Sequence, residues 1–308
     1  ACIPGIYVPS LYEVSYHEDG TIKEMKPLEE GIPERILKEM VTEVSDTYYP
    51  DKPVVPFIKV TQDRVVLEIM RGCIRGCRFC QAGQLYRPVR ERDVEFLKKY
   101  AIAMLENTGH EEISLSSLSS SDYQKLPELI DFLIEECSRR KVNISLPSLR
   151  IDAFSLDVMN KVQDVKKSSL TFAPEAGSQR LRNVINKGLT EEVILQGAKL
   201  AFEGGWTRVK LYFMLGIPFE TEEDIRGIAE LCNKIAAEFY DTVPKEKRNG
   251  RVQIVASTSF FIPKPFTPFQ WAPQCRKEDF LNKAYLTRTA IMSQLNQKSI
   301  KYNWHEAD

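Results

Sequence analysis

Apolar and polar positions follow two alternating patterns along most of the chain. From about residue 60 onward, short apolar runs typical of buried strands lie between longer stretches whose apolar residues recur every three or four positions, as on a helix face. The predicted strands cover residues 64–70, 111–117, 142–148, 168–173, 207–215 and 251–261. The predicted helices cover residues 92–108, 123–140, 155–164, 179–186, 190–204, 221–239 and 277–297. This succession predicts an α/β fold in which right-handed crossovers curl a parallel sheet into a partial (β/α)6 TIM-type barrel.

A different pattern precedes the predicted barrel. Two short runs, 12–16 and 21–25, flank an Asp-Gly turn, which is typical of a β-hairpin. Residues 33–44 have helical periodicity with a proline in the first turn, so we expect an amphipathic helix there. Residues 46–56 contain three prolines and indicate a linker. The start of the chain is therefore expected to form a small hairpin-helix annex.

Composition places the chain among ordinary globular proteins. Its 308 residues are 43% hydrophobic with a net charge of -1, enough for one large core over 59–308 after the annex and linker at 1–58. No apolar run approaches the ~20 residues of a membrane span, and no signal peptide is visible. Seven cysteines, an odd number, argue against a disulfide framework and for a reducing cytoplasmic setting. The near-zero charge gives no general attraction to nucleic acid.

Three of the cysteines, Cys73, Cys77 and Cys80, fall within eight residues directly after the first predicted strand. Three thiolates on one loop point at one centre, so we expect the loop to bind metal. Structural zinc takes four ligands, and no fourth Cys or His lies nearby, although a zinc knuckle or redox loop stays an alternative. A cubane cluster held by three thiolates would have one iron with an open coordination position, which suits a catalytic site.

This spacing, with Phe79 just before the last cysteine, resembles the signature of radical S-adenosylmethionine (SAM) enzymes. The resemblance implies a 4Fe-4S cluster on Cys73, Cys77 and Cys80, whose open iron binds the amino and carboxylate groups of SAM. One electron from the cluster would then cleave SAM to methionine and a 5'-deoxyadenosyl radical. It also implies that Phe79 lies against adenine, and that a flavodoxin- or ferredoxin-type reductant is a partner.

Further candidates for SAM binding follow other predicted strands, where barrel enzymes place their chemistry. Ser119 lies in a serine-rich turn after the second strand, although Ser121 or Asp122 there could instead cap the next helix. Glu175, Ser178 and Lys187 lie in a segment that resembles tRNA methylthiotransferases and oxygen-independent coproporphyrinogen oxidase. Those enzymes carry Gln and Arg where this chain has Glu175 and Lys187, and their pair contacts SAM. The alternative for Lys187 is a charge at a helix C-terminus.

The fifth strand ends in the turn Gly216-Ile217-Pro218, which resembles the turn that closes over adenine in many radical SAM proteins. Thr221 and Asp224 after it approximate a capping box. Lys210 interrupts the same strand and either faces cofactor or substrate inside the barrel or extends along the outer surface. Arg150, after the third strand, either holds a carboxylate or pairs with Asp152.

Two more segments lie near the predicted site. Residues 260–271 combine prolines with aromatics and are expected to wall a pocket, the alternative being core at the barrel's mouth. Arginines crowd the cysteine loop, where they could bind RNA phosphates or neutralise thiolates and pair with Glu91 and Asp93. Without a positive net charge we favour the second role. These arginines are Arg71, Arg75, Arg78, Arg87, Arg90 and Arg92.

Together these motifs resemble an uncharacterised bacterial radical SAM family with a methylthiotransferase-like core, whose full-length members carry a cobalamin-binding-like N-terminal domain. The resemblance implies that this chain is a segment of a longer protein, and that any cobalamin binds a domain absent from it. The expected net reaction is methylation or methylthiolation of RNA, protein or a small molecule. Radical rearrangement or lyase chemistry is one alternative, and a non-catalytic iron–sulfur electron carrier or scaffold is another.

Overall fold

A computed structural model describes residues 3–45, 47–58, 60–145, 170–248 and 250–306. The chain forms two compact units, Ala1–Asp46 and Thr47–Asp308. The sequence-based division at residue 58 stays a prediction.

The first unit contains the predicted hairpin. Strands β1 (Tyr12–Tyr16) and β2 (Ile22–Pro27) pair antiparallel after a short 3-10 turn, η1 (Pro9–Leu11). The turn between the strands depends on Asp19, whose Oδ1 accepts hydrogen bonds from the Thr21 backbone N–H at 2.9 Å and hydroxyl at 2.6 Å. Gly20 has φ +82°, a conformation that favours glycine. The hairpin prediction is confirmed.

The helix predicted over 33–44 is wrong, because these residues form bends and irregular backbone. Most of its predicted apolar stripe is exposed to solvent, with Leu37 66% and Met40 41% exposed, although Val44 is buried. A helix this short is marginal in water unless packing stabilises it, and here its apolar side chains bury little surface.

The second unit contains two parallel sheets, and the α/β prediction is confirmed. The first sheet has the order β3-β6-β7 and the second the order β11-β10-β9-β8. A short antiparallel pair, β4 and β5, follows β3. The strands are β3 (Val65–Glu68), β4 (Met70–Arg71), β5 (Arg90–Glu91), β6 (Glu112–Ser116), β7 (Asn143–Ser145), β8 (Leu170–Glu175), β9 (Arg208–Leu215), β10 (Gln253–Phe260) and β11 (Ile300–Trp304).

Helices α2 and α7 begin at capping residues that the sequence favours. Asp93 caps α2 by accepting the N–H groups of residues 95 and 96, and Gly109, at φ 69°, ends it. Thr221 and Asp224 form the predicted capping box at the start of α7. The helices are α1 (Ala82–Leu85), α2 (Val94–Thr108), α3 (Leu126–Arg140), α5 (Gln179–Val184), α6 (Glu191–Glu203), α7 (Glu222–Thr242) and α8 (Lys277–Met292), with 3-10 turns η2 (Ser120–Asp122), η4 (Lys245–Lys247) and η5 (Gln297–Ser299).

The end of the chain differs from its prediction. The helix predicted over 277–297 stops at Met292, and residues 300–304 then form β11, which pairs parallel with β10 and which the sequence analysis missed. A short edge strand with one neighbour carries little pattern of its own. The predicted strand 142–148 is described as far as Ser145, and the predicted helix 155–164 lies outside the described residues.

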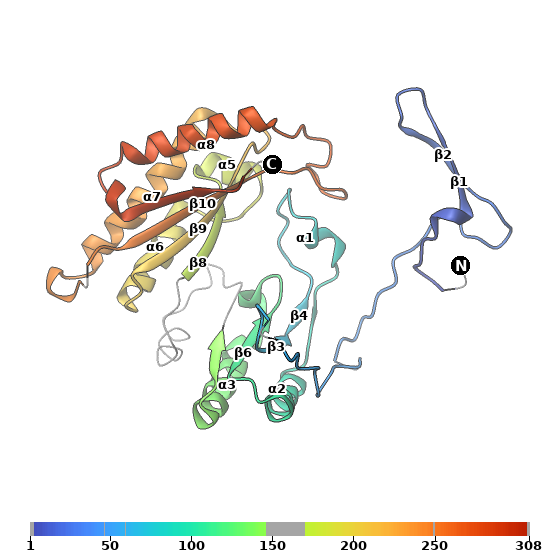
Figure 1. Ribbon diagram of the computed structural model, residues 1–308, viewed down its shortest axis with the longest axis horizontal. Coiled ribbons are helices and arrows are strands. Elements are labelled where there is room, and N and C mark those ends of the chain that lie inside the picture. Colours follow the sequence, from blue (N-terminus) through green and yellow to red (C-terminus); the bar gives the residue numbers. More distant parts are fainter. Residues whose placement is uncertain (1–2, 46, 59, 146–169, 249, 307–308) are drawn as a thin grey trace. The chain divides into compact units, whose positions relative to one another are not determined.

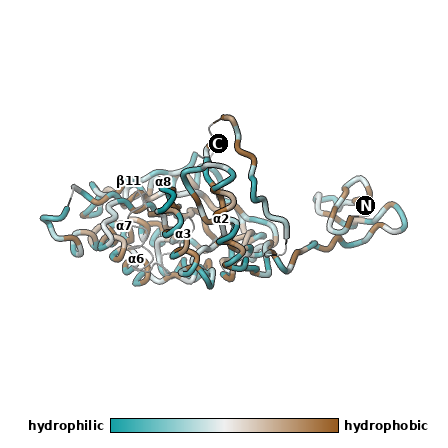
Figure 2. The backbone as a smooth tube through the Cα atoms, turned by 90° about the horizontal axis from the view of Figure 1, so that it is seen from below, coloured by the Kyte–Doolittle hydropathy of each residue, from teal (hydrophilic) through white to brown (hydrophobic). Residues whose placement is uncertain are grey.

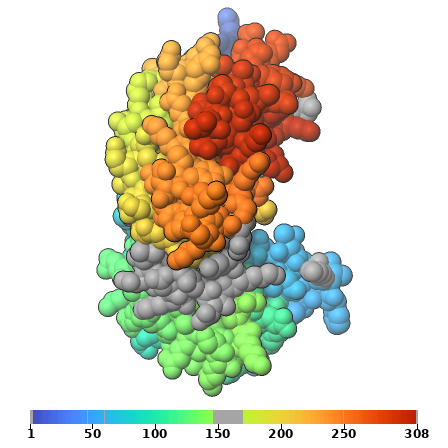
Figure 3. Space-filling view, turned by 90° about the vertical axis from the view of Figure 1, so that its left-hand side faces the viewer, coloured from blue at the N-terminus to red at the C-terminus, as the bar shows by residue number. Residues whose placement is uncertain are grey.

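Each sheet is covered by helices on one face. Helices α6, α7 and α8 pack on the second sheet (Figure 1) and share a core with alternate residues of its strands, such as Val209, Leu211 and Phe213 of β9. Their tubes alternate between hydrophilic and hydrophobic colours, as expected for amphipathic helices (Figure 2). In Figure 3 the yellow-to-red residues that follow about residue 190 form one continuous part of the visible surface. Helices α2 and α3 cover the first sheet in the same way.

A smaller apolar cluster lies where β8, β9 and β10 end. It contains Phe79 of the cysteine loop and Met214, packed against buried residues that follow the three strands, and we call it the rim cluster. Its buried members are Ala176, Leu181, Ile185, Ile217, Phe261 and Phe269. It joins the cysteine loop to the second sheet.

Candidate functional site

The cysteine loop starts at a glycine that no other residue could replace without rearrangement. Gly72 follows β4 with φ +89°, and a Cβ there would lie 2.6 Å from the carbonyl oxygen of Tyr86. The close approach holds the start of the loop against the segment that returns to β5. The three cysteines therefore project from a backbone that is fixed at its base.

The far side of the loop is tied to the segment after α5. The Arg78 N–H donates to the carbonyl of Ile185 at 2.9 Å, and the Asn186 side-chain amide donates to the carbonyl of Gly76 at 2.9 Å. The carbonyl of Arg78 in turn accepts from the Phe269 N–H at 3.3 Å. These contacts link the loop to two segments at the ends of the second sheet's strands.

The cysteines of the chain differ in their surroundings. Cys73 and Cys80 are half-buried free thiols, and the Gly83 N–H lies 3.4 Å from the Cys80 sulfur as a donor. Burial raises the pKa of Cys137 to about 11 and that of Cys232 to about 12, so these core thiols stay protonated. Among the residues described, no group of three His, Cys, Asp or Glu side chains is gathered so that it could hold a metal ion.

Arginines near the loop have structural partners. Arg75 forms a two-point ion pair with Asp122, whose Oδ2 lies 3.1 Å from Nε. Asp122 therefore belongs to the loop's support, and the prediction that it or Ser121 caps the next helix is wrong: α3 starts at Leu126 without a side-chain cap. Arg71 and Arg92 both donate to Glu68. Burial acts to raise the pKa of Glu68, but these two guanidinium groups outweigh it and hold the pKa below its ordinary value. This geometry agrees with a structural role for these arginines.

Three predicted SAM-binding residues lie together beside the loop. Glu175 ends β8 in a left-handed conformation, φ 69°, where the register with β9 shifts. Its carboxylate pairs with the Lys187 ammonium at 3.1 Å, and both side chains are mostly buried. The same ammonium lies 6.0 Å from the centre of the Phe79 ring. A non-glycine residue held at positive φ stores strain, which is common at functional sites.

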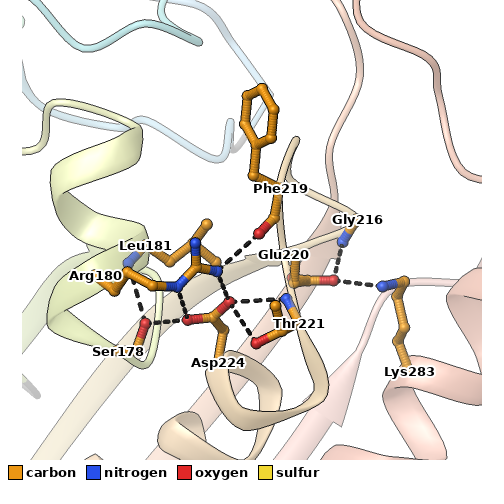
Figure 4. Close-up of polar contacts among 9 residues, drawn as sticks. All are labelled: Ser178, Arg180, Leu181, Gly216, Phe219, Glu220, Thr221, Asp224 and Lys283. Atoms are coloured by element: carbon orange, nitrogen blue, oxygen red, sulfur yellow. Dashed lines mark hydrogen bonds and ion pairs between the residues drawn. The ribbon is translucent and has the colours of Figure 1, made fainter.

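Ser178 belongs to a polar network at the start of α5 (Figure 4). Its hydroxyl caps the helix by accepting the Leu181 N–H at 3.0 Å and donates to Asp224 of α7, which also pairs with Arg180. Burial acts to raise the pKa of Asp224, but its bonds to Arg180, Ser178 and Thr221 together lower it below the ordinary value. From the sequence, Asp224 was expected only as a cap residue, and Arg180 was not singled out. The contact of Ser178 with SAM stays a prediction.

Ser119 follows the end of β6 and has an unusual hydroxyl. The residue is only 2% exposed, and its Oγ has no hydrogen-bond partner among the residues that the structure describes. A buried polar atom left unbonded costs free energy, and such atoms are rare in folded proteins. This orphan hydroxyl is available to a bound ligand.

Gly216 follows β9 at φ +76°, and a Cβ there would lie 2.5 Å from the sulfur of Cys275. Its N–H donates to Glu220 at 2.9 Å, and the Lys283 ammonium reaches the same carboxylate at 2.7 Å (Figure 4). Burial raises the pKa of Glu220 above its ordinary value, although Lys283 and the Gly216 N–H oppose the effect. The contacts of the Glu220 carboxylate with the Gly216 N–H and Lys283 thus hold the turn in place. The contact of Gly216 with adenine stays a prediction.

Lys210 lies on the face of β9 opposite the helices. Its neighbours on that face are Tyr212 and Met214, whereas the intervening residues are buried in the core under α6 and α7. The interior position, one of the two alternatives for Lys210, is therefore the observed one. Arg150 lies outside the described residues.

The aromatic segment after β10 divides into two parts. Phe261 and Phe269 are buried in the rim cluster with Phe79, as the core alternative expected. Phe266, at φ 65°, and Trp271 project into solvent, 70% and 89% exposed. The segment therefore supports the cysteine loop with some rings and presents others at the surface.

A partial parallel barrel with a three-cysteine loop after its first strand defines a class of cluster-dependent enzymes. The family model of the radical SAM superfamily matches residues 67–232, more than half of the chain. The chain belongs to the radical SAM superfamily, and it is an enzyme. This family uses a 4Fe-4S cluster and SAM, as the sequence predicted.

Several known proteins are similar. An uncharacterised protein of Methanocaldococcus jannaschii is 40% identical over 205 residues, which cover 67% of this chain and 42% of that protein. The tRNA-2-methylthio-N(6)-dimethylallyladenosine synthase of Chlorobaculum tepidum is 26% identical over 195 residues, covering 57% and 40%. The chain thus spans less than half the length of these relatives.

The fold is also that of a solved enzyme. The radical SAM methyltransferase TsrM from Kitasatospora setae, with cobalamin and a 4Fe-4S cluster bound, has a TM-score of 0.52 at 13% identity, covering 67% of this chain and 38% of that one. The predicted radical SAM core is therefore confirmed as a fold. In the part of the chain that the structure describes, no helix has the length and apolar character to cross a membrane.

Proposed function

We propose that this chain binds a 4Fe-4S cluster through Cys73, Cys77 and Cys80 and SAM beside it, and that its net reaction is methylation or methylthiolation. The observation that carries the proposal is the convergence of Glu175 and Lys187 on Phe79 of the cysteine loop. These residues come from three different segments, and each was expected at the cofactor.

The side-chain chemistry of the loop suits the cluster, which would draw the three sulfurs together when it binds. Thiolates are the usual protein ligands of iron–sulfur clusters, and the loop offers three of them on a backbone fixed at Gly72, Gly76 and Arg78. When bound, the cluster supplies the electron that cleaves SAM to a 5'-deoxyadenosyl radical. We expect a flavodoxin- or ferredoxin-type protein to supply that electron.

The Glu175–Lys187 pair suits the amino-acid end of SAM. That end carries one amino group, whose N–H groups can donate hydrogen bonds, and one carboxylate, and the pair presents a carboxylate acceptor and an ammonium donor. Lys187 would bind the carboxylate and Glu175 would accept from the amino group, and the Phe79 ring would lie against adenine. The mostly buried setting strengthens such charge-assisted hydrogen bonds relative to water.

The net reaction rests on the relatives. One is named for methylthiolation of tRNA and a similarly folded enzyme for methyl transfer, which supports transfer of a one-carbon or methylthio group. We place any cobalamin on a domain outside this chain, and RNA, protein and small molecules all stay candidate substrates.

Ser119→Ala tests the cofactor site. Removing an unpartnered buried hydroxyl should leave the thermal stability of the SAM-free protein unchanged or slightly raised, because the wild-type hydroxyl has no bond to lose. The same change should weaken SAM binding about fivefold to tenfold, the loss of one hydrogen bond of about 1 kcal/mol. Isothermal titration with SAM and a thermal melt measure both. A purely structural Ser119 would show the reverse, a lower melting temperature with unchanged SAM affinity.

Lys187→Met should weaken SAM binding by about tenfold to a hundredfold, because a charge-assisted bond of about 1.5–3 kcal/mol is lost. Lys187→Arg should retain binding, since a guanidinium keeps the charge and adds a second donor for a carboxylate. The matched control is Lys298→Gln, an exposed lysine of η5. Equal SAM affinities in Lys187→Met and the control would exclude Lys187 from the cofactor site.

A further inference from the structure

The inner face of the second sheet, the face opposite α6, α7 and α8, is polar. In register across β9, β10 and β11 it carries Lys210, Val255 and Lys301 in one row and Tyr212, Ser257 and Asn303 in the next. TIM-type barrels fill their interior mainly with bulky branched side chains. Here only Val255 is of that kind, so this face is not built as a packed interior.

The two rows that cross β9, β10 and β11 carry charge of one sign. Lys210 and Lys301 are their cations, and the residues paired in register with these lysines, Thr171 and Val255, are uncharged. Neither lysine forms an ion pair with an acidic residue in the part of the chain that the structure describes. The whole chain has a net charge of -1, so two uncompensated cations on one face are a local feature.

The Lys210 side chain leads toward the rim cluster. Its ammonium lies 4.7 Å from the centre of the Tyr212 ring, one step closer to the C-terminal end of β9. Met214, the next residue on the same face, packs against the rim cluster that contains Phe79. Tyr212 is 37% exposed, so its ring and the ammonium are open to a ligand.

Lys210 and Lys301 can act on one ligand. Their strands are separated by β10 alone, so their backbones lie about two strand spacings, or ~10 Å, apart. Flexible ammonium groups at that separation can approach one anion from two sides. The Asn303 amide and the Tyr212 and Ser257 hydroxyls stand in the adjoining row as hydrogen-bond donors.

We propose that this face binds an anionic group of the enzyme's small-molecule substrate, a phosphate or a carboxylate, between Lys210 and Lys301. The anion would anchor the substrate below the cofactor, and the reacting carbon would lie toward the rim cluster. This inference rests on the proposed function for its biological meaning, but the anion site itself can be measured alone.

The test is calorimetric titration of the reconstituted 308-residue protein with inorganic phosphate and, separately, with glutarate. Lys210→Gln and Lys301→Gln should each weaken binding of the preferred probe about tenfold, whereas Lys210→Arg should retain it. The matched control, Lys298→Gln on the exposed η5 turn, should bind as the wild type does. The tighter probe identifies the anion as phosphate or carboxylate.

Two results would overturn the anion site: no saturable binding of either probe to the wild type, or equal affinities in Lys210→Gln and Lys298→Gln. Formation of 5'-deoxyadenosine from SAM in the same preparations separates this inference from the proposed function. Cleavage of SAM without lysine-dependent anion binding defeats only the inference. Lysine-dependent binding without cleavage of SAM by the wild type defeats only the proposed function.

Discussion

Cys73→Ala, Cys77→Ala and Cys80→Ala each abolish formation of 5'-deoxyadenosine and sharply reduce the iron and acid-labile sulfide bound after anaerobic reconstitution. This is the expected result, because three thiolates are the fewest that leave a single open iron, and no other described Cys or His lies on the loop. Iron analysis, absorption spectra and mass spectrometry of the reaction mixture give the three readouts.

The matched control is Cys137→Ala. Its thiol lies in the core under the first sheet, where burial keeps it protonated, so the cluster and its activity should survive. Full cluster content and full activity in any one of the three loop variants would remove that cysteine from the metal site. Loss of the cluster in Cys137→Ala would show that the assay reports stability rather than ligation.

Gly177→Ala should be the most damaging single change outside the cysteine loop. A Cβ at Gly177 would lie 2.5 Å from the backbone carbon of Gly227, in the first half of α7, and even closer to the N–H of Ile228. Backbone atoms cannot move away by a change of rotamer, as a side chain can. The turn that contains Gly177 and helix α7 must therefore move apart. We expect a loss of about 3 kcal/mol, at the upper end of overpacking effects, and a melting temperature lower by several degrees.

The same separation moves Glu175 and Ser178, which lie within two residues of Gly177, so SAM binding should fall together with stability. Gly83→Ala is the control, because a Cβ there meets only ordinary contacts of 3.7 Å and more. Differential scanning calorimetry of both variants without SAM compares them directly. A Gly177→Ala melt that matches that of Gly83→Ala would contradict the close packing of this turn on α7.

The regular part of the fold could be predicted because its elements carry strong patterns. Buried strands such as β9 and amphipathic helices such as α7 show them in their own residues. The helix expected over 33–44 failed because periodicity alone does not show whether an apolar stripe has a surface to pack on. Strand β11 was missed because five residues at a sheet edge derive their structure from β10, a partner that local sequence does not reveal.

The candidate site was predictable where one segment carries the whole signal. Cys73, Cys77 and Cys80 stand together in the sequence, and the Thr221–Asp224 capping box is equally local. The partners of Asp122 and Asp224 were not predictable, because Arg75 and Arg180 reach them only after folding. That Lys210 lies on the interior face follows from which face of β9 the helices cover. The sequence of β9 alone does not show which face that is.

The most direct test of the account is one assay on the wild-type chain. The protein is reconstituted anaerobically with iron and sulfide, reduced with dithionite and mixed with SAM, and 5'-deoxyadenosine is measured by mass spectrometry. We expect deoxyadenosine to form together with methionine, in a reaction that depends on the reductant. A reduced, cluster-loaded protein that binds SAM but yields no deoxyadenosine would contradict it, as would a protein that takes up only zinc.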